Sequence, residues 1–301
     1  MTFQTTVAKE VRAVGNGLHS GEPITVTIKP APPKTGYVFV RTDLDGGSVK
    51  ASIDSVDFER LQLATTLAAG DVSIQTTEHL LSALCASGVD NAVIEVDGPE
   101  LPIMDGSASP FLFLIEEAGI KQQAVAASYL KIIKPFHFSH GDKRISVHPD
   151  KQFRISYEIE FDHPLIQRQN KTVVVNRSCY EHEIAPARTF GFLKDVNYLK
   201  SIGLIKGGSL ENAILLDGDS MVNESLRQND EFVSHKILDM IGDLAICGYR
   251  LQGHFVAYKA GHQAHAMFLK ALLAARDCYE IVSEEQVVQA QPLSALIKAA
   301  V

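Results

Sequence analysis

The sequence lacks the features that mark membrane, secreted and disulfide-stabilised proteins. No apolar stretch in its 301 residues reaches the ~18 residues that a membrane-spanning helix requires. The initial residues, MTFQTTVAKEVR, include no hydrophobic segment that could act as a signal peptide. The four cysteines form no C-x-x-C pair, which disfavours both a disulfide framework and a thiolate metal site. We therefore expect a cytoplasmic protein without a transmembrane segment.

Clusters of positive charge are also missing. The 28 Lys and Arg residues are outnumbered by 36 Asp and Glu residues, for a formal net charge of −8, and no basic run is longer than a pair such as Lys143-Arg144. A general nucleic-acid-binding protein would carry a basic face. We therefore expect no nucleic-acid partner, and an anionic ligand must be bound by a few individually placed cations.

Glycine and proline, with 21 and 12 residues, are too few for a fibrous or disordered chain, whereas 46% of the residues are hydrophobic. The length is enough for about two domains. Strand patterns rich in Val, Ile and Thr are followed by helical patterns twice along the chain, which predicts an α+β fold rather than alternating βαβ units. We place the boundary in residues 121–128, which divides the chain into domains at 1–126 and 127–301.

The helical patterns begin and end at recognisable residues. Thr76 or Thr77 can cap a helix that contains TEHLLSALCAS, and Gly88 can end it. Ser107 can cap a second helix, with Pro110 in its first turn. The second half contains a long helical pattern, NDEFVSHKILDMIGDLAICG, and a last one, HQAHAMFLKALLAA.

Histidine and aspartate occur at a spacing that suits a metal site. His235 and Asp239 lie four residues apart in the long helical pattern, so both lie on one face and can share one ion. Lys236, between them, is expected to point elsewhere on the helix. Asp243 stands one further turn along the same stripe, where it could orient a neighbouring histidine. Ordinary surface pairs that bind no metal have the same spacing, so this alternative stays open.

Two further pairs contain groups that could transfer protons. Glu78 and His79 begin the first helix, and adjacent helical positions point ~100° apart, so His79 could face a metal while Glu78 reaches a water molecule. A solvated Glu beside a packed His is the alternative. His262 follows Gly261 at a strand-to-helix turn and could protonate a leaving amine. His265 competes for this role, and we expect one of the two histidines to be a helix-surface residue.

Six segments, in this order along the chain, resemble one known family. They are VGNGLHSG (14–21), TTEHLLSAL (76–84), PIMDGSASPF (102–111), ARTFGF (187–192), FVSHKILDMIGDL (232–244) and YKAGHQAH (258–265). Together they resemble the zinc-dependent UDP-3-O-acyl-N-acetylglucosamine deacetylases of lipid A biosynthesis in Gram-negative bacteria. The resemblance implies a hydrolase that removes the acetyl group of an acylated UDP-sugar, the committed step of this pathway, and releases acetate. We expect it to be a monomer.

The resemblance also implies a role for each chemically active residue. One Zn²⁺ per chain, which Fe²⁺ could replace, would be bound by His79, His235 and Asp239. Two histidines and one aspartate leave a fourth position open to water, as is typical of catalytic zinc. Glu78 would be the general base, and His262 would stabilise the oxyanion and protonate the leaving amine.

The remaining implied residues orient groups or contact the substrate. Asp243 would orient His262 and raise its basicity. Thr189 would donate a hydrogen bond to the carbonyl oxygen as it becomes an oxyanion. The residues implied to contact the UDP moiety are Lys236 and Lys259 at the diphosphate and Phe161 at the uracil.

The family's fold would consist of two domains of similar layered topology, in which helices pack between two sheets, with the active site at their junction. Each domain would carry a small insert. The second insert, at about residues 190–217, could hold the fatty acyl chain in a channel, or its apolar residues could form only the insert's own core. These apolar residues are Phe190, Phe192, Leu199, Ile202 and Leu204. His19 and Asp105 also match the motifs, and we expect them near the site.

Two other functions remain compatible with these residues. One is a zinc amidohydrolase that acts on another N-acyl substrate, although the helical pair reads H-x-x-x-D rather than the H-E-x-x-H of metallopeptidases. The other is a non-catalytic module that binds nucleotide sugars or acyl chains, which would be expected to have lost at least one catalytic residue. Ala64, Thr65 and Thr66 stand where some family members place a cysteine, so a thiolate ligand is excluded there.

Overall fold

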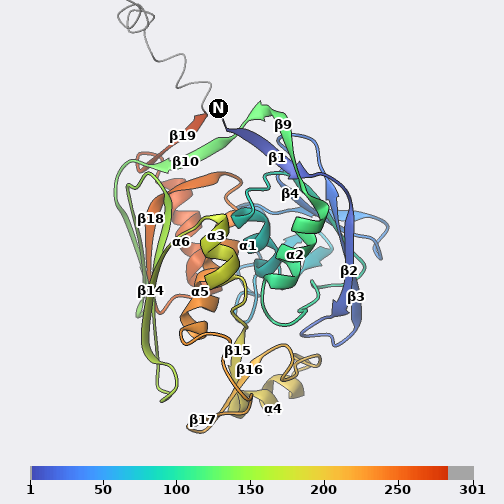
Figure 1. Cartoon of the computed structure of the whole chain (residues 1–301), viewed down its shortest axis with the longest axis vertical. Helices are drawn as coiled ribbons and strands as arrows, with labels where there is room; N and C mark the ends of the chain where they lie inside the picture. Colours follow the sequence, from blue (N-terminus) through green and yellow to red (C-terminus); the bar gives the residue numbers. More distant parts are fainter. Residues whose placement is uncertain (1, 284–301) are drawn as a thin grey trace, which may run out of the picture.

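Two β-sheets enclose a layer of helices in the computed structural model, which describes residues 2–283 (Figure 1). The prediction of an α+β fold with helices packed between two sheets is confirmed. Residues 284–301, the end of the second predicted domain, lie outside the described residues. Within the described chain, every helix is too short or too polar to cross a membrane.

The first sheet has five strands and covers one side of the helices. Its strand order is β2 (Val11–Asn16), β3 (Pro23–Pro30), β8 (Ala92–Val96), β4 (Tyr37–Arg41) and β5 (Gly47–Lys50). β4 and β8 are parallel, and the other neighbours are antiparallel. Buried and partly exposed residues alternate along β4 and β8, because one face packs on the helices and the other faces water.

The second sheet repeats this arrangement on the other side. Its corresponding strands, in the same order and with the same relative directions, are β11 (Phe136–His140), β12 (Lys143–His148), β18 (Arg250–Tyr258), β13 (Phe153–Phe161) and β14 (Gln167–Val174). The first residues of β18 also pair with β10 (Ser128–Ile132), which pairs with β19 (Tyr279–Ser283). The similar layered topology that we expected is therefore present.

Helices occupy equivalent positions in the two halves. α1 (Glu78–Ala86) precedes β8 and α2 (Ser109–Ala118) follows it, whereas α5 (Glu231–Ala245) precedes β18 and α6 (His262–Ala274) follows it. The shorter elements are the 3₁₀ turn Ile53–Ser55, the hairpin of β6 (Leu67–Ala69) and β7 (Val72–Ile74), α3 (Arg177–Cys179) and a π-helical turn at Tyr180–Ile184.

The predicted boundary segment, 121–128, is not a linker in the structure. Most of it forms β9 (Ile120–Ala126), which pairs antiparallel with β1 (Phe3–Val7) at the start of the chain. β10 begins two residues after β9 ends. The division into domains at 1–126 and 127–301 stays a prediction.

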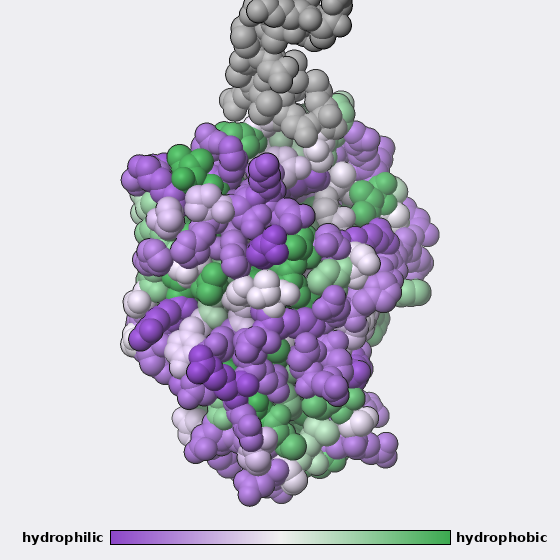
Figure 2. Space-filling view, turned by 60° about the vertical axis from the view of Figure 1, so that its left-hand side comes forward, coloured by the Kyte–Doolittle hydropathy of each residue, from purple (hydrophilic) through white to green (hydrophobic). Residues whose placement is uncertain are grey.

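The second insert forms a small unit at the lower end of Figure 1. It consists of β15 (Phe190–Phe192), α4 (Leu193–Ser201), β16 (Ile214–Asp217) and β17 (Ser220–Met221). None of the residues of α4 is buried, and Tyr198 and Ile202 are more than half exposed. Figure 2 shows apolar surface among polar residues at this end of the molecule.

The predicted N-cap position of α1 is right, although no side-chain capping bond forms there, and Ser107 lies one residue before the N-cap of α2. Thr77 does precede α1, but its backbone is helical, with φ −81° and ψ −19°, and its hydroxyl donates to the carbonyl oxygen of Thr65 at 3.1 Å. Ala108 occupies the N-cap position of α2. The hydroxyl of Ser107 donates to Asp105 at 2.8 Å within the preceding turn and accepts from the backbone N–H of Ser109, the first residue of α2, at 3.2 Å. Short polar side chains before a helix also stabilise such turns, so sequence alone does not decide which bond forms.

The two central helices, α1 and α5, touch where the two halves meet. A Cβ atom added at Gly242 of α5 would lie only 2.0 Å from the carbonyl oxygen of Glu78 in α1. Real atoms do not approach so closely, so only glycine permits this contact. The contact places the first turn of α1 beside the C-terminal third of α5.

We expect Gly242→Ala to destabilise the fold. Alanine favours a helix by about 1 kcal/mol, but overpacking against backbone costs about 1–3 kcal/mol or more. The free energy of unfolding, measured in urea, should therefore fall by about 1–2 kcal/mol. Gly191→Ala is the matched control, because a Cβ there meets no atom within 4 Å. A Gly242→Ala chain as stable as the wild type would contradict the steric argument.

Candidate active site

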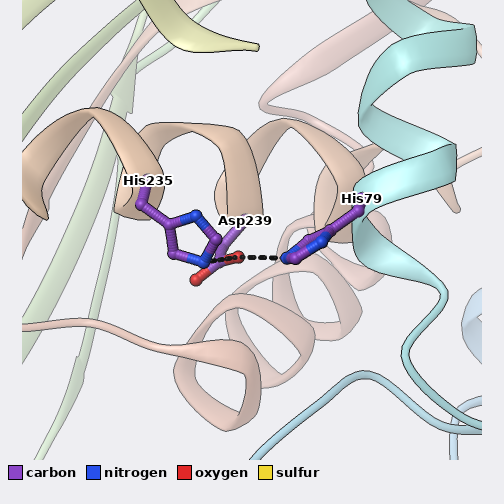
Figure 3. Close-up of side chains that lie close together, drawn as sticks. All are labelled: His79, His235 and Asp239. Atoms are coloured by element: carbon purple, nitrogen blue, oxygen red, sulfur yellow. Dashed lines mark ion pairs between the residues drawn. The ribbon is translucent and has the colours of Figure 1, made fainter. Parts of the chain in front are cut away.

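The contact between α1 and α5 brings together the three residues predicted as metal ligands. His79 lies in the first turn of α1, and His235 and Asp239 lie one turn apart on α5 (Figure 3). Asp239 Oδ1 is 3.8 Å from His79 Nε2 and 3.3 Å from His235 Nε2. The three side chains are buried, and their ligand atoms all lie within 4.8 Å of one another. A single ion could contact all three.

The state of these side chains fits a metal ion. Asp239 Oδ1 is buried and accepts no hydrogen bond from any residue between 2 and 283. His235 donates from Nδ1 to the carbonyl oxygen of Ala187 at 3.0 Å, which leaves the Nε2 lone pair free to face Asp239. Burial lowers the pKa of both histidines, to about 3 for His79, and so keeps the rings neutral. Two imidazoles, one carboxylate and an open position form the donor set of a catalytic metal.

Lys236 turns back toward the same carboxylate. Its Nζ lies 2.8 Å from Asp239 Oδ2, so the expectation that Lys236 points elsewhere on the helix is wrong. The flexible lysine chain reaches a residue three positions on, which shares its side of the helix. Burial alone would raise the pKa of Asp239, but the neighbouring cations Lys236 and His262 outweigh it and hold this pKa well below its ordinary value. The carboxylate is therefore ionised, with Oδ1 left free.

A second buried cluster surrounds Asp243. Its Oδ2 accepts hydrogen bonds from Nδ1 of His262 at 2.9 Å and from Nδ1 of His265 at 2.8 Å, and the hydroxyl of Thr65 donates to its Oδ1. Tyr157 donates to His265 Nε2 at 3.0 Å. Because both Nδ1 atoms are donors here, these side chains form a hydrogen-bond network rather than a second metal site.

The two histidines of α6 are both buried. His262 is 8% exposed and His265 is fully buried, so the expectation that one of them lies on the helix surface is wrong. His265 packs against Tyr157 at the sheet, a contact that helical spacing does not reveal. Burial alone would lower the pKa of His262. The nearby carboxylates, Asp243 above all, have the larger effect and raise this pKa to about 9. At neutral pH His262 is therefore a cation held 3.9 Å from Asp239.

Glu78 faces the site from the start of α1. It is buried, and its Oε2 accepts a hydrogen bond from the backbone N–H of Thr65 at 2.9 Å. Burial raises its pKa to about 7, against the opposing charge of His262. A carboxyl group with a pKa near neutrality can accept a proton and release it again.

Thr65 is a site residue that the sequence did not reveal. Its backbone holds Glu78, and its hydroxyl holds Asp243 and lies 3.3 Å from His262 Nδ1. These partners are 13, 178 and 197 positions away in the chain. Spacing along the chain could not reveal these contacts. The only sequence signal at Thr65 was that some family members place a cysteine in this region.

Phe190 lies beside the cluster of His79, His235 and Asp239, and Thr189 immediately precedes it in the chain. The Thr189 backbone is fixed by an N–H donated to Gly106 at 2.8 Å and a carbonyl that accepts from Ile214 at 2.8 Å. The Phe190 ring lies 6.4 Å from the His235 ring and 5.4 Å from Lys236 Nζ. The segment that leads into the insert therefore borders the site.

Phe161 and Lys259 line one cavity of about 740 Å³. Lys259 Nζ is 3.3 Å from Glu160, and the Phe161 ring contacts the Phe190 ring at 5.6 Å. Phe190 thus connects this cavity with the metal-ligand cluster. The other residues that line the cavity are Glu160, Asp162, His163, Pro164, Gln167 and Arg168.

His19 and Asp105 stabilise loops. The backbone N–H of His19 donates to the buried carboxylate of Glu100 at 3.0 Å. Asp105 forms an ion pair with Arg227 at 2.9 Å and accepts from Ser107. These contacts agree with a turn-building role for both motifs.

Comparison with known proteins identifies the relatives of this chain. The family described as LpxC, UDP-3-O-acyl N-acetylglycosamine deacetylase, matches residues 4–274. The UDP-3-O-acyl-N-acetylglucosamine deacetylase of Shewanella frigidimarina (strain NCIMB 400) is 49% identical over 287 residues, which is 94% of each chain. Those of Shewanella sp. (strain W3-18-1) and Shewanella piezotolerans (strain WP3 / JCM 13877) are 48% and 47% identical, over 95% of this chain and 94% of theirs.

We expect Thr65→Val to destabilise the chain by removing one donor to the buried Asp243. Valine has the shape of threonine and keeps the backbone bond to Glu78. An ionised oxygen left without its donor costs about 1–3 kcal/mol, measured as the free energy of unfolding in urea. Thr65→Ser is the control, because serine retains the hydroxyl. If the valine and serine chains differed by less than about 0.5 kcal/mol, the hydroxyl would not hold Asp243.

Proposed function

Because this chain belongs to the family of UDP-3-O-acyl-N-acetylglucosamine deacetylases, we propose that His79, His235 and Asp239 hold one Zn²⁺ ion at its reaction centre. The chain is a hydrolase of lipid A biosynthesis that removes the acetyl group from the acylated UDP-sugar. The observation that carries the metal proposal is the buried Asp239 Oδ1, which faces two neutral imidazoles without a hydrogen-bond donor in the described chain. Fe²⁺ would suit the same three ligands.

When bound, the metal supplies Lewis-acid activation of a water molecule and of the amide carbonyl. Glu78 accepts the proton of that water. Its burial supports this role, because a pKa of about 7 lets the carboxylate take a proton at neutral pH without holding it permanently. The backbone N–H of Thr65 fixes the direction of the carboxylate.

His262 gives a proton to the departing glucosamine nitrogen. Its cationic state and its 3.9 Å distance from Asp239 support this role, since the ring adjoins the metal ligands. Asp243 orients the ring through Nδ1 at 2.9 Å, so Nε2 is the atom that faces the substrate. The same positive charge stabilises the negative charge that develops on the carbonyl oxygen.

Thr189 donates a hydrogen bond to that developing oxyanion. Its position supports the role, because Thr189 lies two residues after Ala187, whose carbonyl oxygen accepts a hydrogen bond from His235. Lys236 binds a phosphate of the diphosphate when substrate enters. Its flexible side chain can leave the carboxylate of Asp239 and pair with the phosphate instead.

The cavity that Phe161 and Lys259 share suits the nucleotide part of the substrate. An aromatic ring can stack on uracil, and an ammonium group can pair with the diphosphate. Phe190 lies between this cavity and the metal-ligand cluster, where it contacts the sugar or the start of the acyl chain. The insert's apolar residues bind the rest of that chain.

Three further expectations stay predictions: the domain boundary near residue 126, a monomeric state and a cytoplasmic location. Activity on the acylated UDP-sugar, compared with simple N-acetyl sugars, tests the substrate. Equal turnover of both would contradict recognition of the nucleotide and the acyl chain.

Glu78→Ala should keep the metal and lose most of the turnover. Loss of a general base lowers kcat about 10²–10⁴-fold, and the metal ligands are left in place. Zinc content and deacetylation rate are measured on the same preparation. Glu78→Gln is the matched variant, because its amide preserves the shape but cannot accept the proton. A deacetylation rate near that of the wild type in either variant would refute the base assignment.

His79→Ala and Asp239→Ala should each lose bound zinc. Each removes one of three ligands, and a chelator should likewise abolish activity in the wild type until Zn²⁺ is restored. Metal analysis after dialysis measures the loss. Phe113→Ala, which changes a 65% exposed side chain, is the control and should keep its zinc. Full zinc occupancy in both ligand variants would rule out the ligand assignment.

A further inference from the structure

A buried ion pair lies directly behind the metal-ligand cluster. We propose that Glu231 and Arg188 are positioning residues that set the orientation and tautomer of the metal ligand His235. This inference rests on the proposed metal-binding role of His235. Neither Glu231 nor Arg188 is one of the three proposed ligands. Each would act through the backbone at Ala187, whose carbonyl oxygen accepts from His235.

Glu231 is placed to connect α5 with the segment before the insert. It is the first residue of α5, lies one turn before His235 and is completely buried. Its Oε1 accepts from the backbone N–H of Arg188 at 3.0 Å and from Arg188 Nε at 2.9 Å. Its Oε2 accepts from Arg188 Nη2 at 3.3 Å and from the backbone N–H of Arg227 at 2.6 Å. Four donors therefore hold one carboxylate.

The segment 187–189 depends on such bonds because it belongs to no helix or strand. Each of its three residues is held by a hydrogen bond, two of them to α5 and one to the turn at Gly106. The carbonyl of Ala187 accepts from His235, the N–H of Arg188 donates to Glu231, and the N–H of Thr189 donates to Gly106 at 2.8 Å. The bond to Glu231 is the central one of the three, and it returns to the helix that carries His235.

The carbonyl of Ala187 decides which nitrogen of His235 carries the proton. An imidazole that donates from Nδ1 presents its Nε2 lone pair to the metal. His235 Nε2 then lies 3.3 Å from Asp239 Oδ1. If the carbonyl moved away, the ring could rotate or change tautomer, and a protonated Nε2 cannot bind an ion. The ion pair therefore keeps the ligand ready before the metal arrives.

A purely structural role makes a different prediction. Arg188 Nη2 also donates to the carbonyl of Ser225 at 2.9 Å, so the pair joins loops as well. Loop anchoring alone would lower thermal stability when broken but would leave metal affinity unchanged. Metal affinity and ligand geometry separate the two roles.

The test compares zinc affinity in Glu231→Gln and Arg188→Lys with the wild type. Apo protein is titrated with Zn²⁺ against a chromophoric chelator, well below each chain's Tm, and the visible spectrum of the Co²⁺-substituted form reports ligand geometry. We expect each variant to bind Zn²⁺ 10–100-fold more weakly, on the order found for residues that orient metal ligands, with an altered Co²⁺ spectrum. Arg188→Lys keeps the charge and the backbone N–H but loses the two side-chain bonds that fix the Glu231 carboxylate, so it decides the matter if Glu231→Gln does not fold.

Asp90→Asn is the matched control. Asp90 forms a similar two-bond ion pair with Arg250, at 2.9 and 2.8 Å, beyond the far end of α1 from His79. This variant should lower Tm without changing zinc affinity. Wild-type zinc affinity and an unchanged Co²⁺ spectrum in the Glu231 or Arg188 variant would overturn the proposal. His235→Ala, titrated alongside, separates failure of the ligand assignment from failure of the positioning role. If His235→Ala binds Zn²⁺ normally, the ligand assignment fails. If it is the only variant that loses Zn²⁺, only the positioning role fails.

Discussion

The close contact of α1 with α5 is the constraint on which the site depends. Because Gly242 has no side chain, the backbone of α5 can lie against the carbonyl of Glu78. The first helix supplies Glu78 and His79, and the fifth supplies His235, Asp239 and Asp243. Each helix alone carries an incomplete set of groups. A wider separation would leave the proposed base and one proposed ligand on one side of the molecule and the other proposed ligands on the other.

Buried charge is tolerated around this contact because each carboxylate has its own set of partners. Asp243 receives three donors and Glu231 receives four, so neither has an oxygen left over. Asp239 differs from these two, with Oδ2 held by Lys236 and Oδ1 left without a donor in the part of the chain that is described. The contrast distinguishes the oxygen that is available to an ion from those that maintain the architecture.

The sequence predicted those features that follow from short-range periodicity or from a family motif. The α+β class, the central helices and the grouping of His79 with His235 and Asp239 are all present. The errors concern choices that depend on tertiary contacts. The hydroxyl of Thr77 bonds to a carbonyl 12 positions away, and the burial of His265 depends on a strand 108 positions away. Thr65 went unnoticed for the same reason, since its partners lie far away in the chain. The error at Lys236 is instead local, because its flexible chain reaches a residue on the same helix.

The repeated strand order has a consequence for how this enzyme can change. α1 and α5 occupy equivalent positions in the two sheets, each before the strand at the centre, yet they carry different chemistry. The first half supplies the proposed base and one proposed ligand, whereas the second supplies the other two proposed ligands. The two halves therefore share one arrangement of strands and helices but contribute different functional groups. A substitution that shifted one half relative to the other would therefore change the distances within the site without contacting any of its residues.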